Sequence, residues 1–181
     1  GVHSQFDAAA DGGLDYGERR CVVVRRLQGT VTGWKNGGNK MVSLVTGGCG
    51  FIGSHMVDRL LAEGHEVRVI DNWTTGRPEN LAHQDGNKNL TIHHMDIRNK
   101  EQIEPVFQGV DYIFHFAALA DIVPSIQRPY DYYSSNVLGT FNVVECAKNA
   151  GIKKLVYAAS SSCYGIPDEY PTKETAEIRP Q

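Results

Sequence analysis

The sequence has few cysteines and no close cysteine pair. Its 181 residues contain only Cys21, Cys49, Cys146 and Cys163, and no C-x-x-C spacing occurs among them. This distribution favours a reduced, cytoplasmic chain over a scaffold held by disulfide bonds.

Long apolar runs and an excess of positive charge are also lacking. No stretch approaches the roughly 20 apolar residues of a membrane-spanning helix, and no apolar segment of signal-peptide length follows a basic one near the first residue. The 18 basic and 21 acidic side chains leave a net charge of −3, whereas a nucleic-acid-binding domain usually carries a basic face. The sequence therefore predicts no membrane and no nucleic acid as a partner.

A metal site is not expected either. His93 and His94 are adjacent in a predicted strand, so their side chains face opposite sides of a sheet and do not chelate one ion together. No further cluster of ligand residues accompanies them.

What is present is the composition of one globular domain, with 41% apolar and 22% charged residues. Residues 1–40 differ from the remainder, since they are rich in Gly, Asp, Asn and Arg and show almost no helical or strand periodicity. We expect residues 1–40 to be an extension that is disordered or non-native. The alternative is an interaction arm that uses its arginines.

From Met41 onward, short apolar runs alternate with helical patterns. The runs predict five strands, at residues 42–46, 67–70, 90–95, 110–116 and 155–159. Apolar residues at helical spacing predict a helix that ends before Gly64 and a longer one over residues 129–149 that ends before Gly151. Asn99 is a candidate N-cap of a short helix that Pro105 should distort.

Strands that are apolar on both faces and alternate with helices are typical of a parallel sheet covered on both sides. The predicted fold class is therefore α/β, a Rossmann-type doubly wound parallel sheet that ends after the fifth strand.

A glycine-rich segment directly follows the first of these strands. It reads Thr-Gly-Gly-Cys-Gly-Phe-Ile-Gly over residues 46–53 and opens the first helix. Glycines there allow a tight turn and a close approach of the backbone to a pyrophosphate, which the helix N-terminus attracts. Asp71 ends the next strand, where a carboxylate accepts hydrogen bonds from a ribose and repels a 2′-phosphate. The pattern therefore predicts a dinucleotide site for NAD rather than NADP.

Six segments together resemble a known family. They are residues 46–53, Asp71-Asn72, Asp96-Ile97, the His-Phe-Ala-Ala segment at 115–118, Asn136-x-x-Gly139-Thr140, and the Ser-Ser-Ser-Cys-Tyr-Gly segment at 160–165. In this order and spacing, residues 41–181 resemble the extended short-chain dehydrogenase/reductases, and among them the NAD-dependent nucleotide-sugar epimerases and dehydratases.

The resemblance implies a role for each matching position. The cofactor-binding residues would be Gly47, Gly50, Phe51, Ile52, Gly53, Asp71, Asn72, Asp96, Ile97, Ala117, Ala118 and Asn136. Of these, Asp96 would accept a hydrogen bond from the adenine amino group, or else serve as a helix cap, and Asn136 could instead bond only to backbone. Ser160 and Ser161 would be the catalytic residues, and Ser125 and Ser160 would bind the sugar. His115 is expected to be structural rather than catalytic.

One part of the family pattern is missing. The family's acid/base pair is Tyr-x-x-x-Lys, in which the lysine lowers the tyrosine pKa, and no tyrosine here precedes a lysine at that spacing. In the family the pair lies shortly beyond the equivalent of Gln181. We therefore expect a fragment without its C-terminal substrate domain and without turnover of its own.

The reaction is narrowed by the serines before Tyr164. Dehydratases and decarboxylases of this family usually carry an acidic residue two positions before the motif tyrosine, whereas this chain has Ser162 there and Ser161 before it. The resemblance thus favours a UDP-sugar 4-epimerase, of the UDP-glucose or UDP-N-acetylglucosamine type. A dehydratase or decarboxylase and a non-catalytic NAD(H)-binding regulator remain alternatives. The family also implies a homodimer of the full-length protein through the helix at 129–149.

Overall fold

The computed structural model describes residues 22–23, 40–173 and 175–179, without side chains at 22, 23, 161 and 162. Apart from 22–23 and Lys40, the prediction for residues 1–40 therefore lies outside the described residues. No helix in the described segments is both long and apolar enough to cross a membrane.

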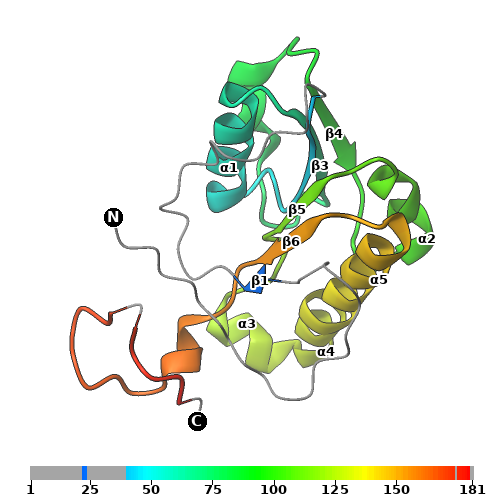
Figure 1. Cartoon of the computed structure of the whole chain (residues 1–181). Helices are drawn as coiled ribbons and strands as arrows, with labels where there is room; N and C mark the ends of the chain where they lie inside the picture. The colour runs from blue at the N-terminus through cyan, green and yellow to red at the C-terminus, as the bar shows by residue number, and fades with distance from the viewer. Residues whose placement is uncertain (1–21, 24–39, 174, 180–181) are drawn as a thin grey trace, which may run out of the picture.

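A parallel sheet forms the centre of the molecule (Figure 1). The strands are β1 (Val22–Val23), β2 (Val42–Thr46), β3 (Glu66–Asp71), β4 (Leu90–His94), β5 (Tyr112–His115) and β6 (Lys154–Tyr157). Their spatial order is β1-β6-β5-β2-β3-β4, and every neighbouring pair is parallel. The five predicted strands and the Rossmann-type class are confirmed, and the short β1 adds an edge beside β6.

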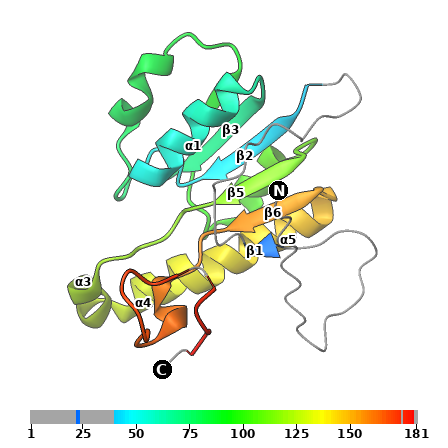
Figure 2. The same ribbon diagram turned by 60° about the vertical axis from the view of Figure 1, so that its left-hand side comes forward.

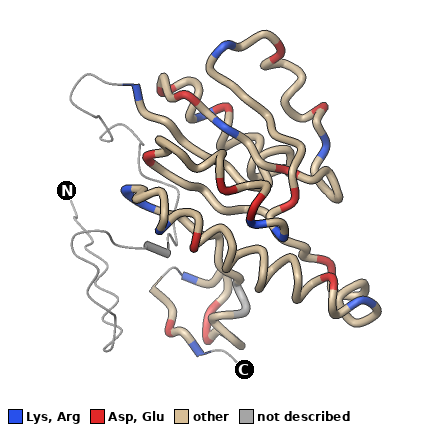
Figure 3. The backbone as a smooth tube through the Cα atoms, turned by 90° about the vertical axis from the view of Figure 1, so that its right-hand side faces the viewer, with Lys and Arg blue, Asp and Glu red and all other residues tan. Residues whose placement is uncertain are grey.

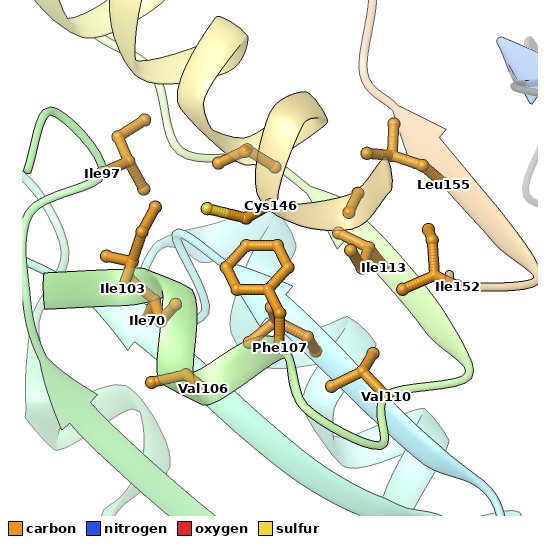
Figure 4. Packing of buried hydrophobic residues seen from close by; sticks show 13 residues of the cluster. Ile70, Ile97, Ile103, Val106, Phe107, Val110, Ile113, Cys146, Ile152 and Leu155 are labelled. Carbon is orange, nitrogen blue, oxygen red and sulfur yellow. The ribbon is translucent and has the colours of Figure 1, made fainter. Parts of the chain in front are cut away.

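Alternation along the strands builds a core on each face of the sheet. Leu44 and Ile113 point to one side, while their successors Val45 and Phe114 point to the other. α5 (Thr140–Ala150) covers the first side and α1 (Phe51–Ala62) covers the second, as Figure 2 shows. Figure 4 shows Phe107 at the centre of the cluster beneath α5. This two-sided burial explains why the strands lack polar alternation.

Glycines end both long helical patterns as predicted. Gly64 follows α1 with a φ of +84° and donates its N–H to the Leu61 carbonyl. Gly151 is the left-handed C-cap of α5, with φ +66°. A residue without Cβ adopts this conformation at no steric cost, so each glycine lets the chain turn back toward the sheet.

The helical stretch at 129–149 is not one continuous α-helix. It consists of α4 (Pro129–Tyr132), a π-helical segment η3 (Tyr133–Gly139) and α5. At the end of η3, a Cβ added to Gly139 would lie 2.6 Å from Cδ1 of Ile97. The glycine therefore allows this helix to lie against the loop after β4. The simple 3.6-residue period predicted the extent of the stretch but not its widened middle.

The shorter elements were only partly predicted. Asn99 does cap α2 (Lys100–Ile103), since its Oδ1 accepts from the Gln102 N–H at 3.2 Å. The following η2 (Glu104–Phe107) is a 3-10 helix that contains Pro105. The pattern did not predict η1 (Pro78–Gln84), α3 (Ile122–Gln127) or η4 (Ser161–Tyr164).

Charged residues are spread over the described chain. Figure 3 shows acidic and basic positions interspersed along the backbone. The expectation that nucleic acid is not a partner stays a prediction.

Candidate functional site

A cavity of about 530 Å³ opens at the carboxyl ends of the strands. In open α/β sheets, ligands bind at this edge, where the strand order reverses, here between β2 and β5. Seven of the predicted cofactor-binding residues line the cavity: Gly47, Gly50, Asp71, Asn72, Ile97, Ala117 and Ala118. Residues from four separate loops therefore meet in one space of the size of a small-molecule site.

The glycine loop is packed too closely for side chains. A Cβ at Gly53 would lie 2.0 Å from the Gly47 carbonyl oxygen, and one at Gly47 would lie 2.7 Å from the Ala117 nitrogen. A Cβ at Gly50 would meet only the Gly47 oxygen, at 3.3 Å. Gly53 thus allows the loop to pack against its own backbone, and Gly47 allows it to pack against the segment at Ala117. Gly50 instead exposes its backbone to the cavity.

The loop leads into the N-terminus of α1. No side chain caps this terminus, and its first turn carries no acidic residue. Phe51 and Ile52 begin the helix with exposed side chains and do not line the cavity. A helix N-terminus without a capping side chain has backbone N–H groups and a partial positive charge available for an anion.

Asp71 is held in place by backbone donors. It is 7% exposed, and its Oδ2 accepts from the Cys49 N–H at 2.9 Å while Oδ1 accepts from the Trp73 N–H at 2.8 Å. A Cβ on Gly76 would come within 2.7 Å of Oδ2, so the 72–76 loop wraps closely round the carboxylate. Burial, and then the charge of Asp71, raise the pKa of the Cys49 thiol to about 11. Cys49 is therefore a protonated, buried thiol rather than a nucleophile.

Asp96 and Arg98 form a tight pair beside the cavity. The Arg98 side chain donates to both Asp96 oxygens, at 2.6 to 3.0 Å, and its backbone N–H donates to Oδ1 at 2.9 Å. Asn72 donates a further bond to Oδ2 at 3.0 Å. These bonds, those from Arg98 foremost, lower the pKa of Asp96 to about 2. Arg98 is among the residues that line the cavity, and Asp96 is not.

A buried histidine supports the loop after β5. His115 is 1% exposed, with Nδ1 hydrogen-bonded to Thr46 Oγ1 at 2.5 Å and Nε2 to Thr140 Oγ1 at 2.9 Å. Thr46 Oγ1 also accepts from the Ala117 N–H at 3.4 Å. Burial lowers the pKa of His115 to about 4, so the ring is neutral near pH 7. These contacts agree with the structural role expected for His115.

Asn136 fixes the same loop from the helical side. Its amide accepts from the Leu119 N–H and donates to the Leu119 carbonyl, both at 2.8 Å. Ser135, not Asn136, lines the cavity. The contacts therefore match the alternative that Asn136 bonds to backbone.

Of the predicted substrate and catalytic serines, Ser160 and Ser125 are not among the residues that line the cavity. Ser160 follows β6 at an exposed position, and its carbonyl accepts from the Cys163 N–H at 3.2 Å. Ser125 lies on α3 and donates to the Ile122 carbonyl at 2.6 Å. The prediction for the Ser161 side chain falls outside what the structure describes. The described segments contain no group of three or more potential metal ligands.

Comparison with known proteins places this geometry in a family. A profile of the NAD-dependent epimerase/dehydratase family matches residues 43–181. The chain belongs to this family. Its members use NAD, and a UDP-glucose 4-epimerase from Bifidobacterium longum, 31% identical with a TM-score of 0.69 over 77% of this chain and 43% of its own, was solved with NAD⁺ and UDP.

Relatives within the epimerase/dehydratase family differ in their reactions. The chain is 41% identical over 139 residues to UDP-glucuronic acid decarboxylase 1 of Arabidopsis thaliana, covering 77% of this chain and 31% of that protein. It is 36% identical over 138 residues to the UDP-glucose 4-epimerase of Bacillus subtilis, covering 74% of this chain and 41% of that protein. The solved UDP-N-acetylglucosamine 4-epimerase of Methanobrevibacter ruminantium is 37% identical with a TM-score of 0.69, over 78% of this chain and 44% of its own. The chain thus spans less than half the length of these relatives.

The residues present fit the family cofactor. Gly50 leaves space where a Cβ would enter the cavity, α1 presents a helix N-terminus without a side-chain cap, and Asp71 is fixed at the end of β3. These are the donor and acceptor groups that a dinucleotide needs for its diphosphate and its adenosine ribose.

Several cavity residues were not singled out from the sequence. Thr74, Thr75 and Gly76 lie in the polar stretch after Asp71, and Arg98 and Ser135 are each adjacent to a residue that was. Proximity to a motif was the available signal. Only the folded loops show which neighbours turn toward the cavity.

Proposed function

We propose that this chain is the NAD-binding part of a nucleotide-sugar 4-epimerase that acts on a UDP-sugar. The observation that supports it most is the cavity at the carboxyl edge of the sheet, where Gly47, Gly50 and Asp71 meet. A cytoplasmic location goes with this proposal and stays a prediction.

The cofactor would be held by residues from four loops. The glycine loop, with the N–H groups of Phe51 and Ile52 and with Gly53 as its packing residue, would bind the diphosphate. Asp71 and Asn72 would hold the adenosine ribose, and Asp96 and Ile97 the adenine. Ala117 and Ala118 would lie along the nicotinamide ribose, with Asn136 fixing their loop through Leu119.

NAD, when bound, would supply the reversible hydride transfer at C4 of the sugar on which 4-epimerisation depends. Ser160, and Ser161 beside it, would hydrogen-bond the C4 hydroxyl and orient it, while Ser125 would contact the sugar. The group that removes the hydroxyl proton is not supplied by any Tyr-x-x-x-Lys pair within these 181 residues. We therefore expect the chain by itself to bind NAD but not to turn over substrate.

The choice of an epimerase rests on Ser161 and Ser162. Neither hydroxyl exchanges protons as a carboxylic acid does, and elimination or decarboxylation requires proton transfer at carbons that a tyrosine at C4 does not reach. A decarboxylase or dehydratase is the second candidate, because the Arabidopsis decarboxylase is 41% identical to this chain. A non-catalytic NAD(H)-binding protein is the third.

Activity is tested on a full-length protein that carries this segment. Incubation with UDP-glucose and with UDP-N-acetylglucosamine should give the C4 epimer without net formation of NADH. Release of carbon dioxide from UDP-glucuronic acid, or of water from a nucleotide-sugar, would instead identify a decarboxylase or a dehydratase. NAD binding without any conversion would favour the third.

We also propose that the full-length protein forms a homodimer through residues 129–149. Large apolar side chains are exposed along this helical stretch, namely those of Tyr133, Val137, Phe141 and Val144. Light scattering after size exclusion should give twice the chain mass, and Phe141→Glu should give the monomer. A monomeric wild-type protein would contradict the proposal.

A further inference from the structure

Arg98 lines the cavity and donates several hydrogen bonds to Asp96, the residue proposed to contact the adenine. Its guanidinium and its backbone N–H together give Asp96 three of its four donors. Its carbonyl accepts from Asn142 Nδ2 at 3.0 Å, and the Ile97 carbonyl accepts from the same nitrogen at 3.0 Å. The loop that carries Asp96 is therefore fixed at both the side chain and the backbone.

The geometry of the pair sets which way the carboxylate faces. Arg98 Nε lies 3.0 Å from each Asp96 oxygen, and Nη2 lies 2.6 Å from Oδ2, so the guanidinium holds the carboxylate along one edge. A planar fork of this kind constrains orientation as well as distance, which an ammonium does not. Oδ1 then carries one full bond, from the Arg98 backbone N–H, and a share of Nε. It retains capacity for another donor.

Arg98 also favours the charged form of the carboxylate. The hydrogen bonds from Arg98 are the largest cause of the low pKa of Asp96, with a smaller contribution from Asn72. An ionised carboxylate only accepts hydrogen bonds, whereas a protonated one also donates. At Oδ1 the carboxylate thus presents an acceptor rather than a donor to a ligand group.

We propose that Arg98 is a positioning residue for purine selection: by holding Asp96 as a fixed acceptor, it makes the site prefer adenine to a 6-oxopurine. The inference rests on the proposed placement of adenine beside Asp96. The 6-amino group of adenine donates to such an acceptor, while the 6-oxo group of hypoxanthine is itself an acceptor and is repelled. Without Arg98, the carboxylate can turn, and a turned carboxylate no longer discriminates between the two bases.

The test compares two dinucleotides, NAD and nicotinamide hypoxanthine dinucleotide, by titration calorimetry on the 181-residue chain. The wild-type chain should bind NAD about tenfold or more tightly than the hypoxanthine analogue. Arg98→Met should reduce this ratio to about threefold or less, and Arg98→Lys should give an intermediate ratio, because it keeps the charge but not the fork. Each ratio is measured within one folded sample, so a general loss of stability does not imitate the effect.

Arg128→Met is the matched control. Arg128 lines the same cavity and carries the same charge, but its ion pair is with Asp131, at 3.6 Å. This variant should weaken both dinucleotides equally, if at all, and keep the wild-type ratio.

The possible failures are distinguishable. If the wild-type chain binds neither dinucleotide, or binds both equally, the proposed placement of the cofactor is wrong. If the wild-type ratio is high and Arg98→Met leaves it unchanged, only the role of Arg98 is wrong. A wild-type preference for hypoxanthine would mean that Arg98 contacts the base itself, which also overturns the inference.

Discussion

Gly50 and Gly53 lie three residues apart in the same loop, yet they face different surroundings. A Cβ at Gly53 would collide with the Gly47 carbonyl oxygen, while one at Gly50 would enter the cavity with a single close neighbour. Gly53 is therefore required by the packing of the loop, whereas Gly50 is proposed to leave room for the ligand.

This difference predicts opposite outcomes for two alanine substitutions. Gly53→Ala should destabilise the chain by about 3 kcal/mol or more, because backbone rather than a flexible side chain must move. Gly50→Ala should leave the urea midpoint nearly unchanged but weaken NAD binding about tenfold or more. Urea unfolding and NAD titration on both variants measure the contrast, and equal loss of stability in both would contradict it.

A second prediction concerns how the stability of the fold depends on pH through His115. Its folded pKa of about 4 lies below the ordinary 6.5, so the unfolded chain binds more protons between these values. The stabilisation from the neutral ring is complete above about pH 6.5 and is lost as the pH falls toward 4. The linkage between proton binding and folding gives a loss of about 3 kcal/mol in the free energy of unfolding.

A variant that lacks only the His115 imidazole isolates this contribution. His115→Gln should lower stability near pH 7 but flatten the decline between pH 6.5 and 4, as measured by urea unfolding at several pH values. His65 is a useful comparison, since burial lowers its pKa too. An unchanged pH dependence in His115→Gln would show that the ring does not titrate as described.

Among the secondary-structure elements, the π-helical segment η3 connects the helical layer to the site. Its Asn136 holds both polar backbone groups of Leu119, two residues after the cavity residue Ala117. π-helical turns often occur at functional sites, where they redirect side chains.

Asn136→Ala should therefore affect both folding and binding. Loss of two partly buried hydrogen bonds should cost about 1 to 2 kcal/mol, and the released loop should bind NAD less tightly. Asn149→Ala is the control, because its side chain bonds only to Glu104 at an exposed site, and it should cost less than about 0.5 kcal/mol. Equal effects of the two substitutions on stability and on binding would contradict this account of Asn136.

The regular elements could be predicted because local pattern determines them. Runs such as residues 42–46 are buried on both faces, and Gly64 and Gly151 take the left-handed conformation that their positions suggested. The π-helical widening and α3 could not be predicted, because three-dimensional contacts with other loops select them. Asp71 was found from its place at a strand end, whereas Arg98 becomes notable only through its contact with Asp96.

At the level of the whole molecule, four loops contribute to one cavity because parallel strands end at a common edge. In the proposed function, the described chain supplies the cofactor-binding part of such a site. The matched segment covers less than half the length of each of these relatives. Sugar choice and proton transfer are therefore proposals about a longer protein, whereas cofactor binding is a property that these 181 residues can be tested for directly.

The most direct test is a calorimetric titration of the 181-residue chain with NAD and, separately, with NADP. The account predicts that NAD binds at one site and NADP about tenfold or more weakly, because Asp71 repels a 2′-phosphate. It also predicts that Asp71→Ala narrows this difference. A chain that is folded by circular dichroism but binds neither dinucleotide, or prefers NADP, would contradict the central claim.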